Sequence, residues 1–150
     1  MELSGQYRIP AERERVFTAL CDPVVLQRCI PVLEDIDRLS PTEYAARVRA
    51  TVGPLKARFS GKLHLLPEDA PRFYILHAQG SGGLAGAVKG EARITLEEVE
   101  GHTHLSYTLA AALGGAVGRL AVKLVQAKAD RVINGFFERF TAEIVGAPEA

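Results

Sequence analysis

Apolar and polar residues alternate along most of this chain, and the alternation predicts a series of β-strands. The first such run occupies residues 3–9, and after residue 32 the period becomes two again. The later runs cover residues 46–52, 55–65, 72–79, 88–99 and 105–111. Each run has one apolar and one polar face, which is typical of an antiparallel sheet that is covered on one side only.

Two short helices are predicted between the first two strands. Residues 11–20 carry apolar side chains at the spacing of an amphipathic helix. Asp22 and Pro23 then form a preferred helix start, with aspartate as the N-cap and proline at the first helical position. Pro31 ends this second helix, because the residue before a proline is biased toward an extended backbone.

One long helix is predicted over residues 116–145. At 1.5 Å per residue it is on the order of 45 Å long. Its apolar residues form two clusters that are rotated around the helix axis, so we expect it to bend or to face two partners; Gly135 is one place for a bend. The sequence therefore predicts an α+β fold in a single domain of residues 1–150, with a curved antiparallel sheet of about seven strands wrapped around one long helix.

The inward face of the predicted sheet has few large side chains. Alternation places small residues at Ala46, Ala50, Ala57, Gly61, Gly90, Ala92 and Ala111. If the long helix does not fill the space opposite them, an apolar cavity remains between helix and sheet. Alternatively, the helix lies closer to the sheet and leaves nothing open. Tyr107, with Tyr74 or His77 on the neighbouring strand, would give such a cavity its polar groups.

We expect the cavity wall to combine strand residues with residues of the second short helix, a glycine-rich loop and the long helix. The predicted cavity residues are Cys29, Ile30, Ala50, Phe59, Tyr74, Leu76, Leu84, Val88, Ala92, Tyr107, Leu109, Val117, Leu120 and Leu124. The glycine-rich loop, residues 80–86, is either a flap with Leu84 and Val88 as lid residues or an ordinary hairpin connection. It is not a phosphate-binding loop, because it lacks the Gly-Lys-Ser/Thr ending and leads into a strand.

Charge and composition narrow the classes of function. The chain has 18 basic and 18 acidic residues and no tryptophan, so neither a global field nor a base-stacking surface favours nucleic acid. The outer face carries one basic ladder, which we interpret as a docking surface for an acidic protein or anionic lipid headgroups. The ladder consists of Arg47, Arg49, Lys56, Arg58 and Lys62. Alternatively, these residues form an ordinary solvated face that Glu43 and Glu91 neutralise.

No catalytic or metal-binding motif emerges from the sequence. Cys21 and Cys29 do not have CxxC spacing, so we expect buried thiols in a reducing compartment. His102 and His104 are spaced like a pair of ligands, but zinc sites need three or four, so we expect no metal. The sequence has neither an export signal nor an apolar run of about 18–20 residues, and we expect a cytoplasmic protein without a transmembrane segment.

Several short runs occur in a specific order and spacing from residue 1 to about residue 145. They are residues 1–5 (MELSG), 9–11 (IPA), 22–26 (DPVVL), 29–31 (CIP), 52–57 (VGPLKA), 59–62 (FSGK) and 87–90 (AVKG). The predicted fold resembles the helix-grip, START-like (SRPBCC) superfamily. Within it, these runs resemble the CoxG family, which takes its name from the G subunit of carbon monoxide dehydrogenase.

The resemblance implies a helix-grip fold with a hydrophobic cavity. Family members are linked to molybdenum-containing hydroxylases of the carbon monoxide dehydrogenase type, which they are proposed to anchor to the membrane or to serve by carrying a quinone. We therefore expect a non-enzymatic accessory protein that binds a quinone- or lipid-like molecule and has no tightly bound cofactor. Many relatives continue into a hydrophobic tail, whereas this sequence stops at Ala150, so we expect peripheral membrane contact at most.

Two other functions stay open on the sequence alone. The same superfamily includes polyketide cyclases and dehydratases, and an enzyme of that kind would use Tyr107, Tyr74 and His77, the polar groups that the predicted cavity offers. A protein-interaction module with a filled interior would act through the basic outer face instead, and its partner binding would weaken steeply with salt.

Overall fold

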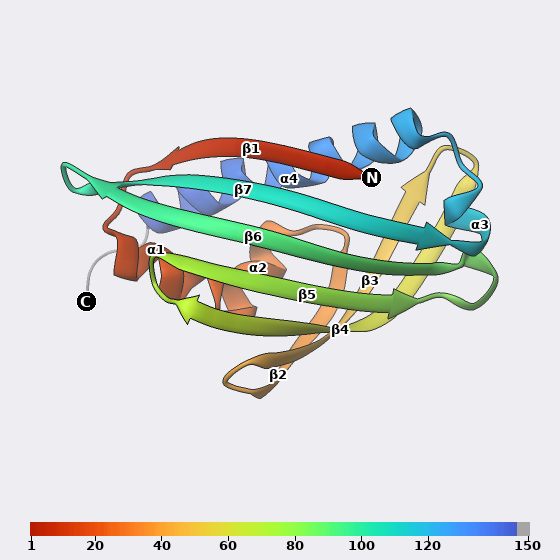
Figure 1. Cartoon of the computed structure of the whole chain (residues 1–150), viewed down its shortest axis with the longest axis horizontal. Helices are drawn as coiled ribbons and strands as arrows, with labels where there is room; N and C mark the ends of the chain where they lie inside the picture. Colours follow the sequence, from red (N-terminus) through yellow and green to blue (C-terminus); the bar gives the residue numbers. More distant parts are fainter. Residues whose placement is uncertain (147–150) are drawn as a thin grey trace.

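A computed structural model describes residues 1–146 of the chain as one seven-stranded sheet with a long helix across it (Figure 1). The strands are β1 (Glu2–Ile9), β2 (Leu33–Ser40), β3 (Glu43–Val52), β4 (Leu55–Asp69), β5 (Phe73–Ser81), β6 (Ala87–Val99) and β7 (His102–Gly114). The helices are α1 (Arg13–Leu20), α2 (Pro23–Cys29), the 3-10 helix η1 (Gly83–Ala85), α3 (Gly115–Gly118) and α4 (Val122–Gly146).

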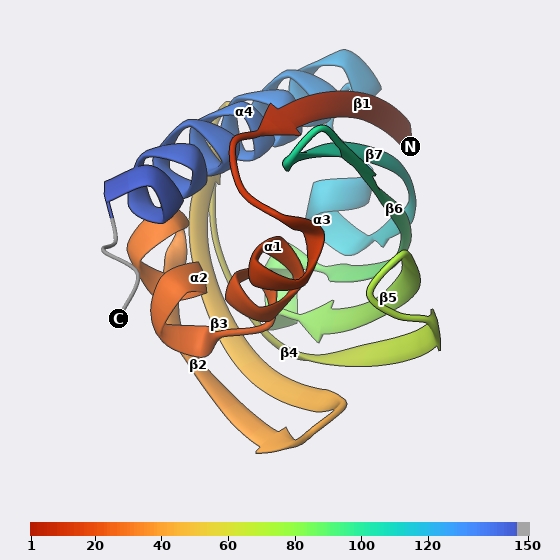
Figure 2. The ribbon, with the colours of Figure 1, turned by 90° about the vertical axis from the view of Figure 1, so that its left-hand side faces the viewer.

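Neighbouring strands of the sheet are antiparallel, in the order β1-β7-β6-β5-β4-β3-β2. Consecutive strands from β2 to β7 lie side by side, whereas β1 pairs with β7 at the far side of the sheet, with Gly5 opposite Tyr107. The sheet curls, so that β1 on one side and β3 on the other approach α4 (Figure 2). The predicted α+β helix-grip fold, with a curved sheet around a long C-terminal helix and two short helices after the first strand, is confirmed.

α4 lies across the open side of the curled sheet and is fastened on both flanks. On the β1 side, the rings of Tyr7 and Phe137 stack with their centroids 4.0 Å apart, and the Tyr7 hydroxyl donates a hydrogen bond to the side-chain oxygen of Asn134. On the other flank, Arg28 of α2 forms an ion pair with Glu143 at 2.6 Å. Such an exposed pair contributes at most about 1 kcal/mol, so burial of the apolar residues of α4 is what mainly holds the helix.

The packed core fills one end of the molecule, beneath α1, α2 and the second half of α4. Its most buried members are Ile9, Val16, Leu96, Leu105 and Phe140. Thr103 is fully buried at the same end, and its hydroxyl donates a hydrogen bond to the Ala11 carbonyl oxygen at 2.8 Å. This bond satisfies the buried hydroxyl and ties β7 to the connection between β1 and α1.

The predicted long helix is interrupted near its start, because α3 ends at Gly118 and α4 begins at Val122. The glycines at 114, 115 and 118 make a continuous helix weak here. A methyl group on Gly118 would lie 2.6 Å from the Leu113 carbonyl oxygen, so α3 turns tightly back onto the end of β7. The change of direction therefore lies at residues 119–121, whereas Gly135, the predicted bend, lies within an unbroken helical stretch.

Two element ends show how residues near them set the boundaries of a helix and a strand. Asp22 accepts a hydrogen bond from the Val24 backbone at 2.9 Å, which confirms the predicted start of α2. β4 continues through Asp69, beyond the alternation predicted over residues 55–65. The pairing of β4 with β5 shifts register between Leu66 and Asp69, so Pro67 lies in an irregular stretch of the ladder, where a missing N–H is tolerated.

Gly61 on β4 faces Gly80 on β5, and the structure predicts that only the second position tolerates a side chain. A methyl group on Gly61 would lie 2.0 Å from the Gln79 carbonyl oxygen, whereas one on Gly80 would find its nearest neighbour at 3.5 Å. We expect Gly61→Ala to lower the free energy of unfolding by roughly 1–3 kcal/mol, the usual cost of overpacking. Gly80→Ala is the matched control and should change it by less than about 0.5 kcal/mol. Urea denaturation measures both, and equal stability of the two variants would contradict this close approach.

Candidate ligand-binding cavity

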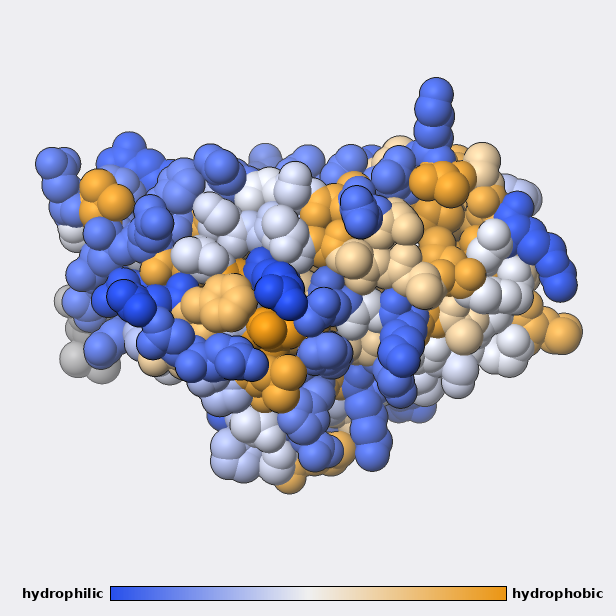
Figure 3. Space-filling model, in the orientation of Figure 1, coloured by the Kyte–Doolittle hydropathy of each residue, from blue (hydrophilic) through white to orange (hydrophobic). Residues whose placement is uncertain are grey.

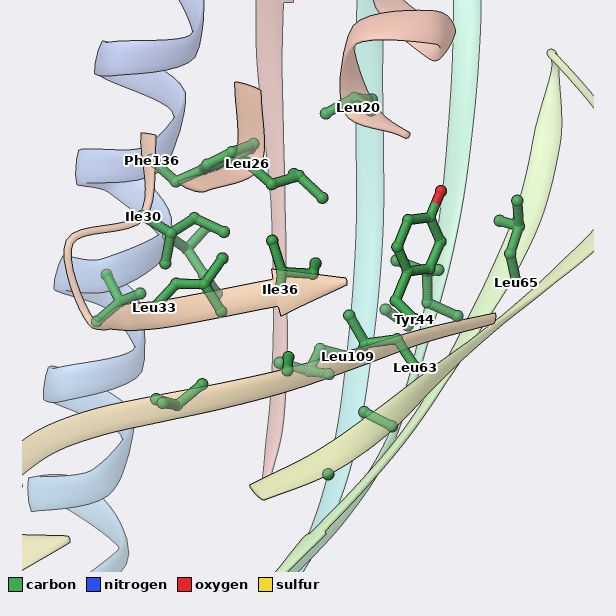
Figure 4. Close-up of a pocket in the computed structure, with 18 of the residues that line it drawn as sticks. Leu20, Leu26, Ile30, Leu33, Ile36, Tyr44, Leu63, Leu65, Leu109 and Phe136 are labelled. Atoms are coloured by element: carbon green, nitrogen blue, oxygen red, sulfur yellow. The ribbon is translucent and has the colours of Figure 1, made fainter. Parts of the chain in front are cut away.

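A cavity of about 530 Å³ lies between the inner face of the sheet and α4 (Figure 4). Residues of β2 to β7 form its wall, residues around α1 and α2 cover one end, and the middle of α4 borders the remaining side. Figure 4 shows Phe136 of α4 reaching toward Leu26 of α2, with Ile30, Leu33 and Ile36 beside them. The volume falls within the range of roughly 300–1,000 Å³ that is typical of small-molecule sites.

Small residues on the sheet leave this space open. Ala46 of β3 faces Gly61 of β4, which in turn faces Gly80 of β5, and Ala92 of β6 also lines the cavity. Opposite them α4 presents Phe136, and the aromatic contact of α4 with β1 prevents the helix from moving closer. Of the two alternatives that the sequence left open, the structure has the open cavity.

Polar side chains gather at the α1 end of the cavity. Tyr44 donates a hydrogen bond from its hydroxyl to the Cys21 carbonyl oxygen at 2.7 Å, and Figure 4 shows this hydroxyl directed toward the end where Leu20 lies. Tyr74 is 2 % exposed and its ring meets Phe17 edge-on at 5.2 Å. Within residues 1–146 the Tyr74 hydroxyl has no hydrogen-bond partner. Because no group of the described residues accepts a hydrogen bond from this hydroxyl, an acceptor atom on a ligand at this end would be stabilised.

Burial keeps these polar groups uncharged. It raises the pKa of Tyr74 and of Tyr44, and it raises the pKa of the Cys21 thiol more than the nearby Arg38 lowers it. Burial also raises the pKa of Tyr107, which lines the cavity from β7. At neutral pH the phenols and the thiol are therefore protonated, and they offer hydrogen bonds rather than charge.

Charged side chains on the strands face away from the cavity. Lys62 and Gln79 border it, but both are exposed at outward positions of β4 and β5, beside glycines that leave the backbone uncovered. His77 also faces outward, because it lies between the inward residues Tyr74, Leu76 and Ala78 of β5, and its ring is 3.6 Å from Glu91. The prediction that His77 supplies a polar group to the cavity is therefore wrong.

Nearly the whole chain matches one protein family. Residues 5–145 correspond to the family described as the G subunit of carbon monoxide dehydrogenase (CoxG). The chain belongs to the CoxG family. The resemblance noted in the sequence is thereby confirmed. No curated protein sequence matches the chain.

Solved structures share the fold of this CoxG-family chain. A conserved protein from Geobacillus kaustophilus has a TM-score of 0.88 and 25% identity, over 97% of this chain and 96% of that one. The Zhui aromatase/cyclase from Streptomyces sp. R1128 has a TM-score of 0.71 and 15% identity, over 96% and 93%. A START superfamily protein from Mycobacterium smegmatis has a TM-score of 0.71 and 12% identity, over 97% of both chains. At the last two identities the likeness is one of fold alone.

Many of the predicted cavity residues line the cavity of this CoxG-family protein. They are Ile30, Phe59, Tyr74, Leu76, Val88, Ala92, Tyr107 and Leu109. All except Ile30 lie on strands, where the alternation of side chains decides which residues face inward.

Other predicted residues lie outside the lining, as far as residues 1–146 show: Cys29, Ala50, Leu84, Val117, Leu120 and Leu124. Cys29 is buried in the packed core, and Val117 is buried beside the end of β7. Leu84 is 98% exposed at η1, so it does not cover the cavity as a lid. Leu120 and Leu124 belong to the start of the predicted helix, whereas the structure places the cavity beneath the middle of α4.

The sequence reasoning missed the part of the wall formed by β2 and the short helices. Leu33, Ile36 and Tyr44 make a buried cluster of their own and also line the cavity. The pairing of β2 with β3 is irregular after Leu33, so a strict period of two did not reveal Leu33 and Ile36. Tyr44 lies at the start of β3, just before the alternating run predicted over residues 46–52. Phe136 belongs to the second apolar cluster of the long helix. The rotation of that cluster around the helix axis was the feature of the sequence that could have placed Phe136 in the cavity wall.

The predicted basic ladder is exposed on the outer face, but acidic residues of β2 pair with much of it. Arg47 forms an ion pair with Asp35, and the hydrogen bond from Arg47 lowers the pKa of that carboxyl. Arg49 and Arg58 both contact Glu34, at 3.4 Å and 2.9 Å. Lys56 and Lys62 have no ion pair within the described residues. The neutralising residues are thus Glu34 and Asp35 rather than the Glu43 and Glu91 considered from the sequence.

The described part of the chain contains neither of two other kinds of site. Among residues 1–146, no group of three or more histidine, cysteine, aspartate or glutamate side chains is arranged to hold a metal ion. His102 and His104 share one side of β7, and His102 lies 3.4 Å from the Arg8 guanidinium. No helix in the described part of the chain has both the length and the apolar character needed to cross a membrane.

Thiol labelling tests whether the cavity is accessible. Cys21 lines the cavity, whereas Cys29 is buried in the core, so we expect N-ethylmaleimide to modify Cys21 first. Because burial raises its pKa, the labelling rate should increase about tenfold per pH unit between about pH 7 and 9. Occupying the cavity with 2-methylnaphthalene should slow the reaction. Intact mass of the wild type, Cys21→Ser and Cys29→Ser follows each thiol, and a rate unchanged by the occupant would place Cys21 outside the accessible cavity.

Proposed function

We propose that this CoxG-family protein is a non-enzymatic carrier of a neutral apolar molecule with a hydrogen-bond acceptor, such as a quinone. The observation that carries the proposal is an open apolar cavity with the unpartnered Tyr74 hydroxyl in its wall. Apolar pockets with a few polar groups are typical of sites that orient a small hydrophobic ligand. The cavity also favours a carrier over an interaction module with a filled interior.

The electrostatics of the cavity favour a neutral ligand over an anionic lipid. Its inward polar groups are phenols and a thiol that remain protonated, and Lys62 lies at an outward position. A free fatty acid would place a carboxylate where no described inward side chain supplies a cation, and burying an unpaired charge is very costly. A quinone carbonyl has no charge, and it accepts a hydrogen bond from a phenol such as Tyr74.

The family description supports the wider role. The chain belongs to a family described as a subunit of carbon monoxide dehydrogenase, and we infer that it assists a molybdenum hydroxylase of that type in the cytoplasm. In this role the protein would carry the quinone-like molecule to or from the enzyme, and its own residues would perform no chemistry. The Zhui aromatase/cyclase shares only the fold, at 15% identity. A cyclase needs a residue that takes up a proton, and the raised pKa values of the cavity groups disfavour that activity.

Solvent extraction and ligand titration test the carrier directly. Mass spectrometry of an organic extract of the purified protein should find an approximately stoichiometric quinone-like molecule. Added 2-methyl-1,4-naphthoquinone should raise the melting temperature of the emptied protein by about 5–10 °C at a hundred times Kd. Ala92→Phe fills the cavity and should abolish this shift, whereas Ala110→Phe, at an exposed outward position of β7, should leave it unchanged. An empty protein that the quinone does not stabilise would contradict the proposal.

Removing one hydroxyl tests how the ligand is recognised. We expect Tyr74→Phe to weaken binding of 2-methyl-1,4-naphthoquinone by roughly 2- to 12-fold, which corresponds to a hydrogen bond of about 0.5–1.5 kcal/mol. Binding of 2-methylnaphthalene, which has no carbonyl, should not change. Isothermal titration of both probes against the wild type and the variant gives the coupling energy between the Tyr74 hydroxyl and the quinone carbonyl. Equal losses for the two probes would mean that Tyr74 contributes through packing rather than through its hydroxyl.

A further inference from the structure

The charges of this neutral chain are segregated along the molecule. Within residues 49–62, 79–90 and 110–129 every charged residue is lysine or arginine. They are Arg49, Lys56, Arg58, Lys62, Lys89, Arg119, Lys123 and Lys128, which include all the lysines of the sequence. These segments meet at the right-hand end of Figure 1, where the β3–β4 turn, η1, α3 and the start of α4 come together.

Most of these cations are unpaired. Glu34 of β2 contacts Arg49 and Arg58, which therefore contribute little net charge. Lys56, Lys89, Arg119 and Lys123 are exposed and have no ion pair among residues 1–146. The charged amino terminus, which bonds to the Ala111 carbonyl oxygen at 2.9 Å, is offset by the adjacent Glu2. This end of the molecule thus has a net positive charge, although the chain as a whole has a formal charge of zero.

Apolar side chains project between these cations. Leu84 in η1 is 98% exposed, and Val122 in the first turn of α4 is 60% exposed. Gly83, just before Leu84, has a φ of +59° and open space around it, so the loop holds the leucine out into solvent. Figure 3 shows apolar surface gathered toward this end, over the region of α3 and the start of α4. We call Lys56, Leu84, Lys89, Arg119, Val122 and Lys123 the basic end.

We propose that the basic end docks on the surface of an anionic lipid bilayer, with its cations among the headgroups and Leu84 and Val122 inserted at the acyl boundary. Lysine and arginine near such a surface are each worth about fivefold in affinity. An exposed leucine at a loop tip gains by leaving water for the acyl region. A protein interface would instead centre on a packed apolar cluster, whereas the apolar residues here are separated by cations.

Acidic residues at the opposite end of the molecule orient the protein as it approaches the membrane. Glu97, Glu98 and Glu100 lie at the β6–β7 turn, which is at the opposite, left-hand end of Figure 1. An anionic surface repels that end and attracts the basic end, so a protein of zero formal charge still approaches in one orientation. None of the six residues of the basic end lines the cavity, so docking through them does not depend on what the cavity holds.

Vesicle sedimentation tests the basic end. The full chain should bind vesicles of phosphatidylcholine mixed with phosphatidylserine and should not bind vesicles of phosphatidylcholine alone. Raising the salt concentration from about 0.1 M to about 1 M shortens the Debye length from about 10 Å to about 3 Å and should release the protein. Lys89→Gln and Lys123→Gln should each weaken binding roughly fivefold, and Leu84→Ser should weaken it roughly tenfold.

Matched substitutions away from the basic end serve as controls. Leu39→Ser removes another exposed leucine, at the end of β2, and Arg139→Gln removes an exposed cation about 24 Å along α4 from Lys123. Both should bind like the wild type, and equal melting temperatures would show that all variants are folded. Binding to neutral vesicles, absence of binding, or equal losses in variants and controls would overturn the proposal. Ala92→Phe should bind vesicles normally, so a failure of the quinone proposal is distinguishable.

Discussion

The contact between α4 and β1 fixes the one distance on which the cavity depends. Phe137 stacks on Tyr7, and the neighbouring Phe140 is fully buried in the core, so the second half of the helix is set by packing at one end of the molecule. The middle of the helix is then carried over strands whose facing residues, such as Gly61 and Ala92, are too small to reach it. The empty space is therefore a consequence of good packing elsewhere, and it needs no separate support.

The strands and their inward faces were predictable because side chains alternate strictly wherever strand pairing is regular. This is why Phe59, Tyr74 and Leu109 were placed in the cavity wall from the sequence. The position of the cavity along the helix was not predictable, since it depends on the interruption at residues 119–121, which local periodicity does not reveal. The pairing of β2 acids with Arg49 and Arg58 also escaped prediction, because strand order and register decide which charges meet.

The cavity of this protein is uncharged, whereas its surface carries unevenly distributed charges. The cavity has hydroxyl and thiol groups whose protonated forms are favoured by burial, so its interior remains neutral. The surface gathers its lysines toward one end, in segments of the chain that contain no acidic residue. Composition alone, with 18 residues of each sign, reveals neither arrangement, because a sum of charges says nothing of where the fold places them.

The pairing of β1 with β7 also determines the order in which the protein can fold. Glu2 lies opposite Ala110, so the first strand has no partner until most of the chain has left the ribosome. Closing so long a loop makes folding slow for a domain of this size, in the range of milliseconds to seconds. α4 follows β7 in the sequence and completes the enclosure last. The wall of the cavity is therefore complete only once both β7 and α4 have been synthesised.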